Sequence, residues 1–199
     1  MKAVWHAVPR DMVGDVLYPL TQLRAVDPAA YEMQRQKYRG RPAVLEYRVP
    51  LVDLHFNAMV HCSPVHPYRM YTARRAAGLP VTARPAPPAP FTGLFFEIPL
   101  ERITVHPVLW YAWRVLWANG APDEDALPEP PAEEFEPFDP DRYSPLNDVP
   151  DAHRQYLAAC KDAGKPALAF VHIPHVLVAG AIDVRDCRVV CWSEAAAQA

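Results

Sequence analysis

Short runs of alternating hydrophobic and polar residues, punctuated by prolines, dominate this chain and predict its β-strands. Residues 2–8 alternate in this way and stop at Pro9, where the missing backbone N–H ends regular pairing within a sheet. Runs that alternate, or that are rich in β-branched and aromatic residues, predict six further strands. These strands lie at residues 43–49, 95–98, 108–115, 167–172, 176–178 and 188–192.

Three segments carry the start and stop signals of helices instead. The first begins with Asp27, an N-cap residue followed by proline, and ends at Gly40 after several basic residues. The second runs from about residue 67 to Gly78, and the third covers about residues 150–163 and is followed by a glycine. Together with the strands, these segments predict an α+β fold with about three helices.

Two proline-rich stretches interrupt this pattern. Residues 80–90 contain five prolines and predict a stiff linker. Residues 121–141 contain nine acidic residues, six prolines and no lysine or arginine, so they bury too little apolar surface to offset the entropy of ordering. We expect an acidic, proline-rich loop or flap there, inside a single domain that spans residues 1–199.

Net charge and cysteine usage exclude several classes of protein. The formal net charge of −3 gives no overall basic field to attract nucleic acid or an anionic membrane. No apolar run approaches the roughly 20 residues that span a bilayer, and the N-terminal residues lack the apolar stretch of a signal peptide. We therefore expect a soluble, cytoplasmic protein with no membrane partner. The four cysteines form no CxxC pair and are expected to be reduced core thiols.

The densest group of polar residues that can carry chemistry lies just before the second predicted helix. It comprises Asp53, His55, Asn57, His61, Cys62, Ser63 and His66. Free backbone amides at the start of the helix would let this group bind an anion. In the alternative interpretation, Ser63 or His66 caps the helix, and the other histidines bond to backbone carbonyls.

Two further interpretations of this segment remain open. A metal site would use His55, His61 and His66, although their spacings of six and five residues match neither a zincin helix nor a compact zinc loop. Cys62 or Ser63 beside His61 would act as a nucleophile, although no glycine elbow flanks the serine. The chain lacks a P-loop, a GxGxxG fingerprint and the zinc-deaminase signature, which disfavours those enzyme classes.

Three separate stretches resemble the ADP-ribosyltransferase superfamily, especially its small DarT-like members, which modify nucleic acid using NAD. Residues 4–9, Val-Trp-His-Ala-Val-Pro, are similar to a first strand whose histidine lies near the NAD site, and His6 is the matching residue. Residues 60–71 look like the family's aromatic, polar and proline-containing segment that leads into a helix. Residues 173–190 resemble the family's late and final strands, with His175 in place of the catalytic glutamate.

The resemblance implies a split, mostly antiparallel β-sheet core that holds NAD as a substrate, with nucleic acid or protein as the acceptor. Because a neutral histidine provides no carboxylate, Glu97 or Glu46 from a neighbouring strand would have to supply one. Alternatively, His172 and His175 would act as acid and base. The candidate catalytic residues are His175, Glu97 and His172. The candidate NAD-binding residues are His6, Tyr18, Arg48, His61, Ser63 and His66.

Two other classes of function remain as alternatives to a NAD-dependent ADP-ribosyltransferase or NAD-cleaving enzyme. The acidic residues of 121–141 would let a non-catalytic module bind a basic protein partner. A hydrolase of unrelated type, with or without a metal, would use His55, Asn57, His61 and His66.

Overall fold

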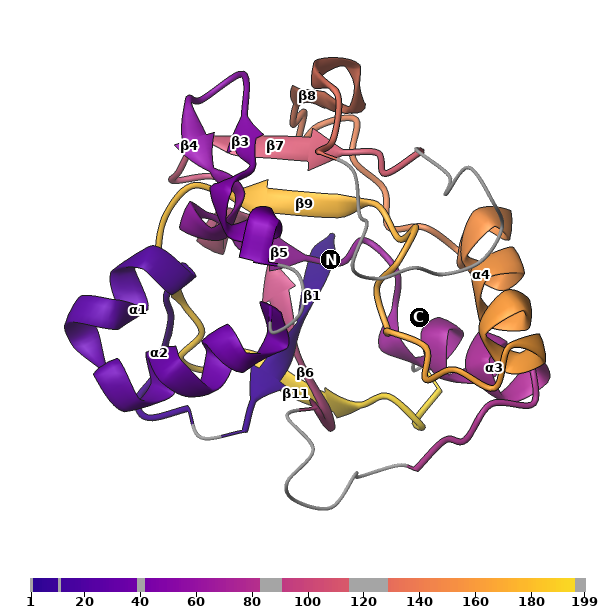
Figure 1. The fold of residues 1–199 in the computed structure, drawn as a ribbon. Coiled ribbons are helices and arrows are strands. Elements are labelled where there is room, and N and C mark those ends of the chain that lie inside the picture. Colours follow the sequence, from indigo (N-terminus) through magenta and orange to yellow (C-terminus); the bar gives the residue numbers. More distant parts are fainter. Residues whose placement is uncertain (1, 11, 39–41, 83–90, 115–128, 196–199) are drawn as a thin grey trace.

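The computed structural model describes residues 2–10, 12–38, 42–82, 91–114 and 129–195. Two antiparallel sheets form the centre of the molecule, with helices on both flanks (Figure 1). This arrangement confirms the predicted α+β class with a split, antiparallel sheet. Residues 83–90 of the predicted linker and residues 121–128 of the predicted acidic loop lie outside the described ranges.

The first sheet has the strand order β1-β6-β11. Its strands are β1 (Ala3–Pro9), β6 (Phe91–Pro99) and β11 (Arg188–Cys191). In the register of β1 and β6, Trp5 lies opposite Glu97 and His6 lies opposite Phe96. Because neighbouring residues of a strand point to opposite faces, Trp5 and Glu97 face one side of this sheet and His6 faces the other.

The second sheet has the strand order β5-β9-β7-β8. Its strands are β5 (Val60–Cys62), β9 (His175–Val178), β7 (Val108–Tyr111) and β8 (Phe135–Pro137). The two sheets join where Trp5 of β1 exchanges backbone hydrogen bonds of 2.9 and 2.7 Å with Ser63, just beyond β5. Two short ribbons complete the set: β2 (Val16–Leu17) with β10 (Ile182–Asp183), and β3 (Arg48–Val49) with β4 (Leu54–His55).

Four α-helices lie within the described residues. They are α1 (Leu20–Val26), α2 (Pro28–Arg35), α3 (Pro67–Ala76) and α4 (Asp151–Asp162). The pair α1 and α2 packs on one flank, and α3 and α4 pack on the other (Figure 1). The last three match the predicted helices, although α2 gives way after Arg35 to a short 3₁₀ helix (Gln36–Tyr38). The sequence does not predict α1, because it has no side-chain cap and no acidic residue in its first turn.

Two of the predicted strands are wrong. Residues 43–49 form a 3₁₀ helix (Pro42–Glu46) and then only the two residues of β3, because the fixed φ of proline suits the start of a helix. Residues 167–172 form an irregular segment that ends in a turn, and His172 has a φ of 57°. This left-handed conformation lies outside the extended region that a strand requires.

The described part of the predicted acidic loop is an edge of the second sheet. Residues 129–141 contain a 3₁₀ helix (Ala132–Glu134) followed by β8, which pairs with β7. Glu134 is buried, and its Oε2 accepts a hydrogen bond of 2.7 Å from the backbone N–H of Arg114. Phe135 packs into an apolar cluster, and this burial outweighs the acidic composition around it.

Buried apolar side chains fix the strands that carry the candidate site. One cluster beneath α3 and α4 includes Phe95 and Leu157. A second cluster includes Val4 of β1 and Val176 of β9, and Leu177 of β9 belongs to a third. This burial holds β1 and β9 in place. It therefore also fixes the positions of His6 on β1 and His175 on β9.

Tyr143 links the segment before α4 to β1. Its hydroxyl donates a hydrogen bond of 2.8 Å to the backbone carbonyl of Ala3, and both residues are buried. The substitution Tyr143→Phe should lower the free energy of unfolding by about 1–3 kcal/mol, because a buried acceptor loses its partner. Urea denaturation of the native and substituted proteins measures this difference. An unchanged midpoint would contradict it.

Candidate functional site

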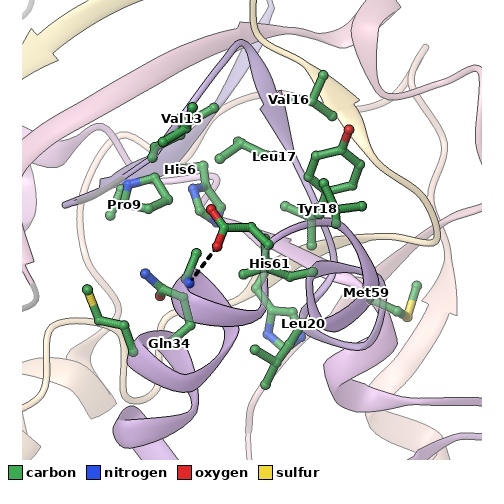
Figure 2. A pocket seen from close by; sticks show the side chains of 18 of the residues that line it. His6, Pro9, Val13, Val16, Leu17, Tyr18, Leu20, Gln34, Met59 and His61 are labelled. Carbon is green, nitrogen blue, oxygen red and sulfur yellow. Dashed lines mark hydrogen bonds between the residues drawn. The ribbon is translucent and has the colours of Figure 1, made fainter.

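A cavity of about 320 Å³ lies between the α1 and α2 pair and the strands that join the two sheets (Figure 2). Its wall comes from β1, the residues between β1 and α1, both helices, β5 and β9. Apolar side chains such as Leu20, Leu23 and Met33 form much of this wall. A largely apolar cavity with a few polar groups is typical of a small-molecule site.

Four of the predicted site residues line this cavity. They are His6 of β1, Tyr18 after β2, His61 of β5 and His175 of β9. Figure 2 shows His6, Tyr18 and His61 around the same space. The rings of His61 and His175 meet edge to face, with centroids 5.6 Å apart. The fold therefore brings polar groups from the N-terminal, middle and C-terminal parts of the sequence to one cavity.

A backbone carbonyl fixes the orientation of His61. Its Nε2 lies 2.7 Å from the carbonyl oxygen of Phe56, so Nε2 carries the proton and donates it. The ring of Phe56 packs edge to face against His61 at 4.2 Å between centroids. One predicted alternative, that a histidine of this segment bonds to a backbone carbonyl, is thus confirmed for His61. The same side chain also lines the cavity.

His175 is a neutral histidine in the wall of the cavity. Burial, together with positive charge on His61 and His6, lowers the pKa of His175 to about 3, while a backbone hydrogen bond with Ile173 acts in the opposite direction. Its buried Nδ1 has no hydrogen-bond partner at normal distance among the described residues. At neutral pH this side chain can exchange hydrogen bonds with a ligand, but it cannot supply a negative charge.

Asp27 is a site residue that the sequence analysis missed. It caps α2, where its Oδ1 accepts a hydrogen bond of 2.9 Å from the backbone N–H of Ala30, drawn as the dashed line in Figure 2. The same carboxylate lines the cavity and is the one acidic group among the described lining residues. The sequence signals the cap, but nothing local shows that the cap faces His6 and His175 across a cavity.

Arg48 lies outside the cavity lining, contrary to its predicted contact with NAD. It is exposed, and its guanidinium forms an ion pair of 2.6 Å with Asp53. Its backbone N–H donates to Glu129 at 3.3 Å. Two acids of the predicted acidic loop, Glu129 and Glu134, therefore bond within the protein. Burial removes Glu134 from any surface for a basic partner, whereas Glu129 remains exposed.

Ser63 and His66 have local structural roles rather than the predicted contact with NAD. The buried hydroxyl of Ser63 closes a tight turn through hydrogen bonds of 3.1 and 3.0 Å to the backbone of Val65. His66 caps α3, since its Nδ1 accepts a hydrogen bond of 3.2 Å from the N–H of Tyr68. Burial lowers the pKa of His66. The predicted capping alternative is therefore correct for His66.

Glu97 is not brought to His175 as predicted. It lies opposite Trp5 on β6 and so points away from the face of β1 that carries His6. Its carboxylate lies 3.4 Å from Arg188 of β11. Glu46, the other predicted carboxylate, is exposed in the 3₁₀ helix before β3. Neither carboxylate lines the cavity.

His172 is buried beside the cavity but does not line it. Its ring packs against Trp113 and Tyr156, with centroids 6.0 and 6.3 Å away. Burial lowers the pKa of His172, and the backbone of Trp113 opposes this. The predicted pairing of His172 and His175 as acid and base is not formed around the cavity.

The other interpretations of the residue 53–66 segment gain no support from the geometry. The described residues contain no group of three or more His, Cys, Asp or Glu side chains arranged to hold a metal ion. His61 and His66 are each bonded to backbone instead. Cys62 is fully buried, and burial raises the pKa of its thiol. A buried thiol that resists ionisation is a poor nucleophile.

Comparison of the chain with protein-family models, curated proteins and solved structures finds no match. Within the described residues, no helix is both long enough and apolar enough to cross a membrane. The cavity and its polar side chains are therefore the basis for assigning a function.

Proposed function

We propose that the cavity binds NAD and that the protein cleaves the bond between nicotinamide and ribose. The observation that carries this proposal is the position of His6, His61 and His175. Each lies in one of the three separate stretches that resemble the ADP-ribosyltransferase superfamily, and all three line one cavity. A shared wall for three such distant residues is the arrangement that this function requires.

The dimensions and polarity of the cavity favour the nicotinamide ribose half of NAD as its occupant. A volume of about 320 Å³ lies at the lower end of the range of ligand sites. The described lining contains no lysine or arginine, the side chains that usually bind phosphate. In this proposal the diphosphate and adenosine extend from the cavity toward solvent.

The proposed reaction with water as acceptor is a substitution at C1′ of the ribose. The bond from C1′ to the nicotinamide nitrogen breaks, and its electron pair leaves with nicotinamide. The water oxygen bonds to C1′, and one proton passes to solvent. Neutral His175, which lines the cavity, would orient the ribose through a hydrogen bond from its imidazole ring. Transfer of ADP-ribose to a hydroxyl of nucleic acid or protein breaks the same bond. The hydroxyl oxygen then bonds to C1′ in place of water, and its proton passes to solvent.

The substitution His6→Ala should weaken NAD binding at least about 10-fold, because it removes a polar group from the cavity wall. Calorimetric titration measures the affinity, and release of nicotinamide measures turnover. His55→Ala is a matched control, since His55 does not line the cavity and its loss should leave the affinity unchanged. Native protein that neither binds NAD nor releases nicotinamide would overturn the proposed function.

A further inference from the structure

The charge of the cavity wall is one-sided. Asp27 is the one acidic side chain among the described lining residues, and no lysine or arginine lies among them. His175 is neutral at physiological pH, because burial lowers its pKa to about 3. The remaining polar wall includes Tyr18 and Gln34, which carry no charge, and the two histidines His6 and His61. The Asp27 carboxylate is therefore the one source of negative side-chain charge in the described wall.

The local structure leaves Asp27 free to act on a ligand. Its side chain makes one hydrogen bond, from the N–H of Ala30 to Oδ1, and the described residues offer it no ion-pair partner. The N-terminus of α2 contributes a partial positive charge of about half a unit. That partial charge compensates only part of the negative charge on the carboxylate, so the cavity beside it retains a negative potential.

Aromatic rings also line the cavity that contains Asp27. Tyr18, Tyr38 and Phe170 line the cavity from three different segments. The faces of aromatic rings attract cations, and a carboxylate beside them adds a direct countercharge. Aliphatic wall residues such as Leu20 and Leu23 favour a flat, largely apolar body.

We propose that the cavity selects a cationic aromatic nitrogen heterocycle and that Asp27 is its countercharge. This inference rests on the proposed function only for the identity of the ligand, in which case the heterocycle is the oxidised nicotinamide ring. Oxidised NAD carries its positive charge on that ring, and reduced NAD does not. The resulting selectivity is for charge, which shape alone cannot provide.

The test uses two probes of nearly identical shape. The 1-methylnicotinamide cation and neutral 3-methylbenzamide share the same skeleton and differ in the ring nitrogen and its charge. Calorimetric titration of the native protein with each probe, up to about 5 mM to cover weak ligands, should show a preference of at least about 10-fold for the cation. Oxidised and reduced NAD are titrated in parallel.

The substitution Asp27→Asn removes the charge and keeps the helix cap, because asparagine is as good an N-cap residue as aspartate. The preference for the cation should fall to about 2-fold or less in this variant, while binding of 3-methylbenzamide stays unchanged. Glu32→Gln is the matched control. Glu32 is an exposed residue of the same helix outside the lining, so the substitution removes one charge without touching the cavity.

The outcomes separate this inference from the proposed function. A charge preference that Asp27→Asn removes supports the inference even when native protein fails to bind NAD, and such a failure overturns only the proposed function. Equal affinity for both probes, binding of neither probe, or an unchanged preference in Asp27→Asn overturns the inference. A preference lost equally in Glu32→Gln also overturns it, because the effect would then come from overall charge.

Discussion

Acidification from pH 7 to pH 4 is expected to lower the free energy of unfolding by several kcal/mol. His153 of α4 is fully buried, and its Nδ1 lies 2.6 Å from the carbonyl oxygen of Val171. Its Nε2 is buried without a hydrogen-bond partner among the described residues. Burial lowers the pKa of His153 to about 4, well below the value of about 6.5 in an unfolded chain.

The direction of the effect follows from proton binding. Between these two pKa values the unfolded chain binds a proton that the native protein excludes, so stability falls as the pH drops below about 6.5. For His153 the loss amounts to on the order of 3 kcal/mol and levels off near pH 4. His175, whose pKa burial lowers to about 3, adds a further loss that continues below pH 4.

Urea denaturation at pH 7, 5.5 and 4 measures this dependence. His153→Asn is the informative variant, because its amide can still donate to the Val171 carbonyl and does not titrate. The variant should be less stable than the native protein at pH 7 but should lose clearly less stability on acidification. The same loss between pH 7 and pH 4 in both proteins would contradict a buried neutral His153.

Local signals in the sequence are sufficient for most of the secondary structure. Asp27 followed by proline marks the start of α2, and alternation up to Pro9 marks β1. The errors arise where a proline starts a helical turn or where tertiary packing decides the conformation. Residues 43–46 have strand propensity but form a 3₁₀ helix that begins at Pro42, and residues 135–137 pair at a sheet edge despite their acidic surroundings.

The candidate site is predictable only in part, for a related reason. The roles of His66 as a cap and of His61 as a donor to a carbonyl depend on neighbours within a few residues, and spacing is enough to propose them. Asp27 is also a local cap, but its place in the cavity depends on how the α1 and α2 pair packs beside β1 and β9. No local pattern encodes that long-range arrangement.

The substitution Ala30→Phe is expected to abolish ligand binding, with a loss in affinity of at least about 100-fold, or about 2.7 kcal/mol. Ala30 lies on α2 and lines the cavity, so a phenyl ring at this position would occupy the space that a ligand needs. The backbone N–H that bonds to Asp27 is unaffected by the change. The loss should apply equally to NAD and to the 1-methylnicotinamide cation.

Ala29→Phe provides the matched control for this prediction, because the neighbouring Ala29 is exposed and does not line the cavity. Both substitutions carry the same small cost in helix propensity, about half a kcal/mol, so a difference between them reports the cavity alone. Thermal denaturation should place the two variants within a few degrees of each other. Retained affinity in Ala30→Phe would show that ligands bind elsewhere, because a filled cavity cannot admit them.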